Sequence, residues 1–191
     1  KNLLIFVVMF AAKSINLTNL STLLILFFSF SFVVSSTYIL NDLMDIKSDQ
    51  NHPTKKNRPL ASGKISENKA IIIMIILFLT GNLVIFILNQ NLLIYSLSYV
   101  FFTMMYSFKL KYLKYADLIN ISILFLIRLS IGGEAISISI SLALYIFVFF
   151  SSLGVVSGKK LSILGNENIV NSKVKIFLET NYTDSELKNI M

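Results

Sequence analysis

Residues 20–40 read LSTLLILFFSFSFVVSSTYIL and contain no charged side chain. As a helix this stretch is about 30 Å long, which matches the hydrocarbon core of a bilayer. The sequence then turns polar and continues as Asn41-Asp42-Leu43-Met44-Asp45-Ile46-Lys47-Ser48-Asp49. This boundary predicts a membrane-spanning helix that ends in a cluster of carboxylates at the membrane surface.

Apolar stretches of the same kind recur along the chain. Read with a window of about 20 residues, they lie near residues 2–12, 20–40, 69–88, 91–108, 117–133 and 140–157. The composition agrees, because 55% of the residues are hydrophobic and only 14% are charged, against about 25% charged in soluble domains. We predict an all-α, multi-spanning transmembrane helical bundle that forms a single membrane domain over residues 1–191. Its polar loops are expected at 41–68, 109–116 and 158–191, and the tail from residue 166 is expected to be surface helix and loop.

The basic residues are distributed very unevenly between these loops. Fourteen of the 17 follow the second, fourth and sixth apolar stretches, namely Lys47, Lys55, Lys56, Arg58, Lys64, Lys69, Lys109, Lys111, Lys114, Lys159, Lys160, Lys173, Lys175 and Lys188. The positive-inside rule assigns that side to the cytosol. We therefore predict a protein integral to the cytoplasmic (inner) membrane, with its acidic cluster facing the cytosol. Topology accounts for the net charge of +7, so nucleic acid is not an expected partner.

Cysteine and histidine usage limits the kind of metal that the chain can bind. The sequence has no cysteine and a single histidine, His52, which excludes a disulfide framework and a zinc centre. Any metal here is expected to be a hard cation held by oxygen. The chain starts at Lys1, without an initiator methionine or a cleavable leader, and we expect it to be a piece of a longer protein.

Four side chains of the polar boundary share one helix face. At about 100° per residue, Asn41, Asp42, Asp45 and Asp49 fall within an arc of roughly 100°. Carboxylates that close together beside a membrane repel each other and lose hydration, so a cation is expected to neutralise them. Mg²⁺ suits such a site, since it takes one or two carboxylates and is completed by water and substrate phosphates. The alternative is a solvated helix end with capping acids.

The loop after these acids is basic and stiff. Residues 52–63 read HPTKKNRPLASG, with Lys55, Lys56 and Arg58 between two prolines. Such cations beside a magnesium site are suited to clamping the oxygens of a diphosphate. A topology signal or a contact with anionic lipids would produce the same pattern.

Together, residues 41–49 and 52–63 resemble the first aspartate-rich motif of the UbiA superfamily of intramembrane prenyltransferases. The His-Pro-Thr-Lys-Lys run is most similar to the decaprenyl-phosphate phosphoribosyltransferase branch. Three later stretches support that branch: 106–111, reading YSFKLK and followed by Asp117; 126–133, reading LIRLSIGG; and 158–160, reading GKK. Lys160 replaces the arginine of the family, and Ile163 stands where an acidic residue is expected.

The resemblance implies a fold of nine transmembrane helices around a central cavity, of which about six are present here. It implies magnesium-dependent transfer of a 5-phosphoribosyl group from phosphoribosyl diphosphate to a polyprenyl phosphate, with release of diphosphate, as in cell wall precursor synthesis. The catalytic residues would be Asp42, Asp45, Asp49 and Arg128, and the magnesium ligands Asn41, Asp42, Asp45 and Asp49. Substrate would also contact Asn41, Lys55, Lys56, Arg58, Tyr106, Lys111, Asp117, Lys159 and Lys160.

Arg128 lies eleven residues into the fifth apolar stretch, where an unpaired charge is costly. We expect it to face the cavity, neutralised by Asp117, Asp45 or a substrate phosphate, or else to form a structural ion pair.

Two other functions stay open. The second basic loop offers one acid, Asp117, and not a pair, which favours a phosphoribosyl donor over the polyprenyl diphosphate of a UbiA-type aromatic prenyltransferase. A non-catalytic transporter subunit is the alternative from another class. The largely unbroken apolar stretches argue against it, because transporter sites are typically built from discontinuous helices.

Overall fold

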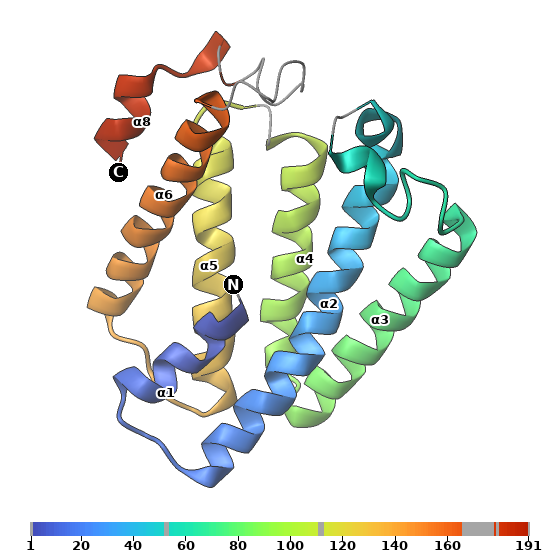
Figure 1. Cartoon of the computed structure of the whole chain (residues 1–191). Helices are drawn as coiled ribbons and strands as arrows, with labels where there is room; N and C mark the ends of the chain where they lie inside the picture. The colour runs from blue at the N-terminus through green and yellow to red at the C-terminus, as the bar shows by residue number, and fades with distance from the viewer. Residues whose placement is uncertain (1, 52–53, 111–112, 166–177, 179, 191) are drawn as a thin grey trace.

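The structure is a computed structural model that describes residues 2–51, 54–110, 113–165, 178 and 180–190 (Figure 1). Within these residues all regular structure is helical, which confirms the predicted fold class. The elements are η1 (Asn2–Phe6), α1 (Val7–Ala11), α2 (Leu17–Gln50), η2 (Lys55–Asn57), α3 (Glu67–Leu88), α4 (Leu92–Phe108), α5 (Ala116–Ala135), α6 (Leu142–Leu164) and α8 (Asp184–Ile190).

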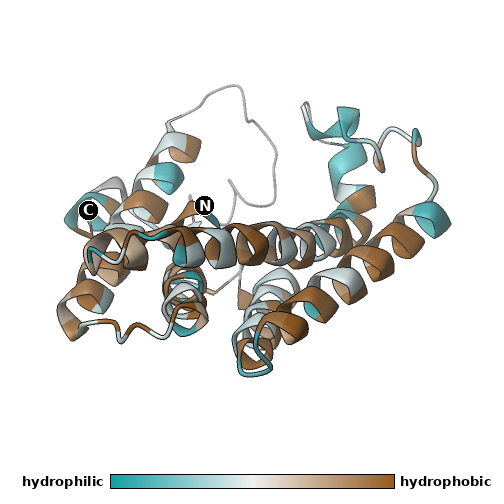
Figure 2. Ribbon diagram, turned by 90° about the horizontal axis from the view of Figure 1, so that it is seen from below, coloured by the Kyte–Doolittle hydropathy of each residue, from teal (hydrophilic) through white to brown (hydrophobic). Residues whose placement is uncertain are grey.

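Four helices, α2, α3, α5 and α6, are long and apolar enough to cross a membrane. Two shorter apolar segments, Asn2–Ala11 and Leu92–Phe108, lie at the other predicted stretches. Most of α3 is hydrophobic in Figure 2, and little of it is buried within the bundle. Such an outer surface suits lipid contact, so the chain is an integral membrane protein, while the bounds of each crossing stay a prediction.

The long helices stand side by side (Figure 1). α2 packs against α3 and α4, and α5 packs against both α4 and α6. The loop after α2, the loop after α4 and α8 all lie at one end of the bundle (Figure 1). This is the end that the charge pattern assigns to the cytosol.

α2 is longer than its apolar stretch. It begins at Leu17, where the Asn16 side chain accepts a hydrogen bond from the backbone N–H of Asn19 at 2.7 Å. It continues to Gln50, ten residues past the predicted end at Leu40. The carboxylates therefore project from a regular helix, as the helical arc requires.

Two glycines allow backbones to approach closely. A Cβ at Gly81 of α3 would lie 2.7 Å from the carbonyl oxygen of Ser29 in α2. A Cβ at Gly132 of α5 would collide with the carbonyl group of Ile5 in η1. The second contact brings the first helical turn onto α5, and this positions Asn2 at the candidate site.

In the part that the structure describes, the tail packs against the bundle through its apolar side chains. Leu178, Tyr182 and Leu187 are buried against Leu118 and Val156 of α5 and α6. Residues 166–177 and 179 lie outside the described residues.

Candidate metal and phosphate site

The acidic arc of α2 is present as predicted. The Asn41 amide donates to Asp45 Oδ2 at 3.2 Å. Asp49 is buried, with 2% of its surface exposed, whereas the side chain of Asp42 is 33% exposed. The four side chains thus form a continuous polar face that turns inward at Asp49.

The basic loop folds back onto this face. Arg58 Nη1 donates to Asp42 Oδ1 and to Asp49 Oδ2, at 2.8 Å in each case. Lys55 Nζ lies 3.8 Å from Asp49 Oδ1, while Lys56 is exposed. The turn of η2 directs Arg58 toward the acids, since the Arg58 N–H bonds the carbonyl of Lys55 at 2.9 Å. Lys55 and Arg58 therefore join the acidic face, and Lys56 remains at the surface.

The electrostatics of this cluster favour an added cation. Asp42 lies beyond the apolar part of α2, and loss of hydration raises the pKa of its carboxyl above the ordinary value. Arg58 acts against this shift, whereas the negative charges of Asp49 and Asp45 add to it. Because the pKa of Asp42 is raised overall, Arg58 and Lys55 only partly offset the loss of hydration and the charges of the neighbouring carboxylates.

The donor set fits magnesium in its chemistry, because Asn41, Asp42, Asp45 and Asp49 offer only oxygen as metal ligands. In the described part of the chain, no three acidic, histidine or cysteine side chains converge closely enough to hold a metal ion by themselves. Arg58 instead lies between Asp42 and Asp49. A magnesium ion here would use one or two carboxylates and need water and phosphate oxygens to complete its shell.

Arg128 is buried in α5, with 3% of its surface exposed. Its Nε donates to Asn2 Oδ1 at 3.1 Å, its Nη1 to the Leu124 carbonyl at 2.7 Å, and its Nη2 to the Tyr99 hydroxyl at 2.7 Å. Its guanidinium carbon also lies 4.7 Å from the centre of the Tyr99 ring. These neighbours are neutral, so the expected pairing of Arg128 with Asp117 or Asp45 is not observed.

Asp117 pairs instead with Lys160 of α6, and both side chains are buried. Lys159, the next residue, is exposed, and Tyr106 is half-buried on α4. Lys111 lies outside the described residues. The structure therefore forms a second charged cluster around Asp117 and Lys160, whose part in substrate binding stays a prediction.

A cavity of about 440 Å³ lies along α2 on the N-terminal side of the acidic face. Its lining residues are Asn2, Leu3, Phe27, Val34 and Tyr38. Tyr38 lies one helical turn before Asp42, on the same side of α2, and Asn2 contacts Arg128. The cavity is thus lined by Tyr38, one turn from the first carboxylate, and by Asn2, which contacts the buried guanidinium.

Sequence reasoning missed Asn2 and Tyr99 as neighbours of Arg128, and Tyr182 as a neighbour of Asp117. The only available signal was a polar side chain within an apolar stretch, and it names no partner. The pairing depends on which helices pack together.

Comparison with known proteins agrees with this architecture. Residues 2–157 match the UbiA prenyltransferase family. Decaprenyl-phosphate phosphoribosyltransferase of Mycobacterium tuberculosis is 30% identical over 169 residues, which are 88% of this chain and 56% of that protein. The enzyme of the same name from Mycolicibacterium smegmatis is 32% identical over 162 residues, 85% of this chain and 51% of that one. The chain thus spans about half the length of these relatives.

A solved structure shares the fold. The UbiA homolog from Archaeoglobus fulgidus, determined with GPP and Mg²⁺ bound, superposes with a TM-score of 0.72 at 18% identity, covering 98% of this chain and 69% of that one. At this identity the likeness concerns the fold alone. The helical architecture and the match over most of the sequence lead to one conclusion: the chain belongs to the UbiA prenyltransferase family.

Proposed function

We propose that this chain forms part of a magnesium-dependent transferase that moves a 5-phosphoribosyl group from phosphoribosyl diphosphate to a polyprenyl phosphate and releases diphosphate. The observation that carries the proposal is the cluster of Asp42, Asp49 and Arg58 at one end of α2. The cavity lined by Tyr38 and by Asn2, the neighbour of Arg128, lies along the same helix. The phosphoribosyltransferase relatives support this choice of substrates.

The first cluster would bind the donor. Asn41, Asp42, Asp45 and Asp49 would hold magnesium, which when bound supplies Lewis-acid neutralisation of the leaving diphosphate. Lys55, Lys56 and Arg58 would bind the non-bridging oxygens, because cationic side chains make strong hydrogen bonds to phosphate.

The buried arginine would serve the acceptor. Arg128 supplies a positive charge with neutral neighbours, and an anionic phosphate is favoured in its field. The isoprenoid tail is suited to the apolar wall of the cavity, made by Leu3, Phe27 and Val34. Tyr106, Lys111, Asp117, Lys159 and Lys160 remain proposed substrate contacts at the second and third cytosolic loops.

In the proposed reaction the bond between ribose C1 and the diphosphate oxygen breaks, and an oxygen of the polyprenyl phosphate forms the new bond to C1. The acceptor phosphate is already ionised, so the step requires no general base. The side chains therefore act by positioning and by stabilising charge. The charge pattern supports a site that faces the cytosol.

The test is transfer of label from phosphoribosyl diphosphate to polyprenyl phosphate in membranes that contain the protein. A labelled lipid is expected only with magnesium, and Asp45→Asn is expected to lower turnover and magnesium affinity at least tenfold. Glu67→Gln, at the exposed start of α3, is the matched control with the same change of charge.

Two outcomes would replace this proposal. Transfer of a prenyl chain from a polyprenyl diphosphate to an aromatic acid, without a labelled ribosyl lipid, would indicate the aromatic prenyltransferase. Absence of magnesium-dependent diphosphate release with either donor would leave the transporter alternative. Unchanged magnesium affinity in Asp45→Asn would remove the metal site.

A further inference from the structure

The described part of the tail is attached to the cytosolic ends of α5 and α6. Leu178 and Leu187 are buried there, with 1% and 0% of their surfaces exposed. Lys114, in the loop before α5, lies 2.9 and 3.1 Å from the two carboxylate oxygens of Glu186. Figure 1 shows α8 beside α6 at this end. The attachment is thus both apolar and ionic.

Tyr182 contacts the start of α5 and both residues of the Asp117–Lys160 pair. Its hydroxyl accepts the backbone N–H of Tyr115 at 2.6 Å and donates to Asp117 Oδ1 at 3.2 Å. Its ring centre lies 4.2 Å from Lys160 Nζ. One side chain, 5% exposed, therefore holds the start of α5 and both members of the buried ion pair.

Tyr115 has a backbone conformation that requires such support. Its φ of +65° and ψ of −30° place a bulky residue in the left-handed region, which persists only when the surroundings impose it. It connects the second cytosolic loop, with Lys109 and Lys114, to the first turn of α5. Its conformation therefore decides where that loop leaves the bundle.

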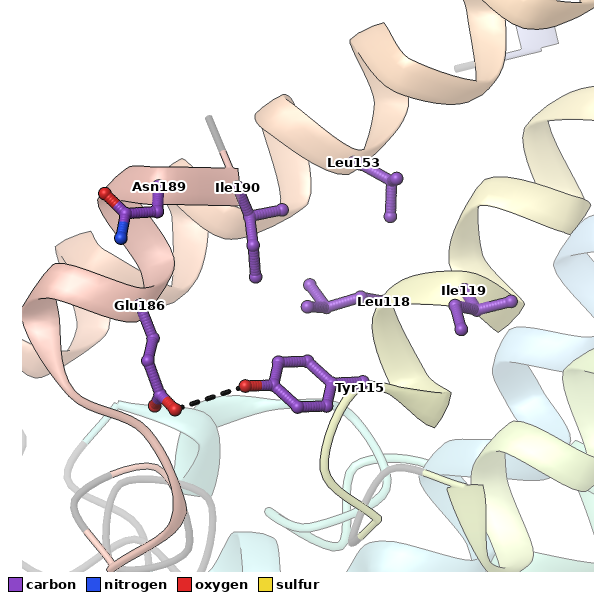
Figure 3. A pocket seen from close by; sticks show the side chains of 7 residues that line it. All are labelled: Tyr115, Leu118, Ile119, Leu153, Glu186, Asn189 and Ile190. Carbon is purple, nitrogen blue, oxygen red and sulfur yellow. Dashed lines mark hydrogen bonds between the residues drawn. The ribbon is translucent and has the colours of Figure 1, made fainter.

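The Tyr115 side chain is only partly packed, with its ring edge-on to the Tyr182 ring at 5.6 Å between centres. A cavity of about 500 Å³ lies beside it, and Figure 3 shows the ring at the cavity edge with its hydroxyl bonded to Glu186. Tyr115 as a whole is 40% exposed. The hydrogen bond from the Tyr115 N–H to the Tyr182 hydroxyl, at 2.6 Å, is the restraint on its backbone that comes from the tail.

The ion pair also has a partner in the tail. Asn120 and Ser157 lie three residues further into α5 and α6 than Asp117 and Lys160. Asn120 Oδ1 and Ser157 Oγ are buried and have no hydrogen-bond partner among the described residues. Asp117 Oδ1 accepts one hydrogen bond from the backbone N–H of Leu118 at 2.9 Å and one from the Tyr182 hydroxyl, which is the bond that the tail contributes.

We propose that Tyr182 is a positioning residue that fixes the Tyr115 junction and the Asp117–Lys160 pair, and so places the second cytosolic loop for binding of a diphosphate. The consequence for diphosphate binding rests on the proposed function. The tail segment then supports donor binding through Tyr115 and the Asp117–Lys160 pair and does not contact the donor itself.

The test uses Tyr182→Phe, which removes the hydroxyl and keeps the ring. Hydrogen exchange at the Tyr115 amide is expected to rise roughly tenfold, the effect of losing one buried hydrogen bond. The dissociation constant for magnesium diphosphate is expected to rise roughly three- to tenfold, with helix content unchanged.

Tyr145→Phe is the matched control. It removes a hydroxyl that bonds Ser130 at 3.0 Å. This bond joins α5 to α6 at the end of the two helices that is opposite to Tyr182. Exchange at Tyr115 and diphosphate affinity are expected to equal those of the unmodified protein.

Each outcome decides the proposal. Unchanged exchange at Tyr115 in Tyr182→Phe overturns the positioning role, and increased exchange with unchanged diphosphate affinity overturns its link to the site. If the unmodified protein does not bind magnesium diphosphate, the link is also overturned. If it binds magnesium diphosphate but transfers no phosphoribosyl group, the proposed function fails while the result for Tyr182 stands.

Discussion

Arg58 Nη1 lies 2.8 Å from the carboxylate of Asp49. Asp49 is buried, whereas the Arg58 side chain is 37% exposed, so the contact lies at the boundary between protein and solvent. The same nitrogen binds Asp42. Arg58 therefore lies between two carboxylates where a divalent cation would be expected, and the two cations compete for these oxygens.

Replacing Arg58 by Gln is expected to raise the affinity for magnesium alone roughly tenfold, because a competing positive charge is removed. Affinity for magnesium diphosphate is expected to fall, since the phosphates lose a cationic partner. Titration calorimetry measures both quantities. Lys64→Gln, which changes an exposed cation of the same loop, is the control. Lower magnesium affinity in Arg58→Gln would show that Arg58 supports the metal site and does not compete with it.

The fold and the acidic face were predictable because both follow from local periodicity. Apolar stretches became helices, and the regular geometry of α2 aligned Asn41 with Asp49. The contact of Arg58 with that face was not predictable, since a loop bounded by prolines sets it. Of the expected partners of Arg128, Asp117 and Asp45 are not observed for a related reason: Asp117 binds Lys160 from another helix, and Asn2 arrives from the other end of the chain.

Arg128→Met tests whether the buried guanidinium serves chemistry or packing. Methionine retains an unbranched apolar side chain but leaves Asn2 Oδ1 without its donor, which costs about 1–3 kcal/mol of stability. Transfer is expected to fall by roughly 100-fold or more, the typical effect of removing a preorganised electrostatic group. Thermal unfolding and the rate of lipid labelling separate the two effects. Tyr99→Phe, which removes one neutral acceptor of Arg128, is expected to cause a smaller loss. Full transfer activity in a folded Arg128→Met protein would assign Arg128 to structure alone.

Attachment of the tail is expected to depend on pH through Glu186. The backbone N–H of Thr183 and the ammonium of Lys114 lower the pKa of Glu186 to about 2, from an ordinary value of 4.5. Because the pKa is lower in the folded state, the ionised carboxylate stabilises the attached tail above pH 4.5. This contribution is lost as the pH falls from 4.5 to about 2.

The sequence has no tryptophan, so Ile190→Trp at the cavity edge provides a unique fluorescence reporter of this attachment. Its emission is expected to shift to longer wavelength between pH 4.5 and about 2. Addition of Glu186→Gln to the reporter chain is expected to remove that pH dependence. A transition of the same size with Gln at this position would exclude Glu186 as its source.

The close contact between Gly132 and Ile5 is expected to affect transfer at Arg128 as well as stability. A Cβ at Gly132 would collide with the Ile5 carbonyl, so Gly132→Ala must displace η1 from α5, at a cost of about 1–3 kcal/mol. Because η1 carries Asn2 to Arg128, transfer is expected to fall together with stability. Gly165→Ala is the matched control, since a Cβ there would lie at an ordinary 3.6 Å from the carbonyl oxygen of Leu161. Thermal unfolding and lipid labelling of the two variants distinguish a local effect of alanine from loss of this contact. If Gly132→Ala unfolds at the same temperature as Gly165→Ala, η1 is not held against α5 by this close approach, and the position of Asn2 beside Arg128 must have another cause.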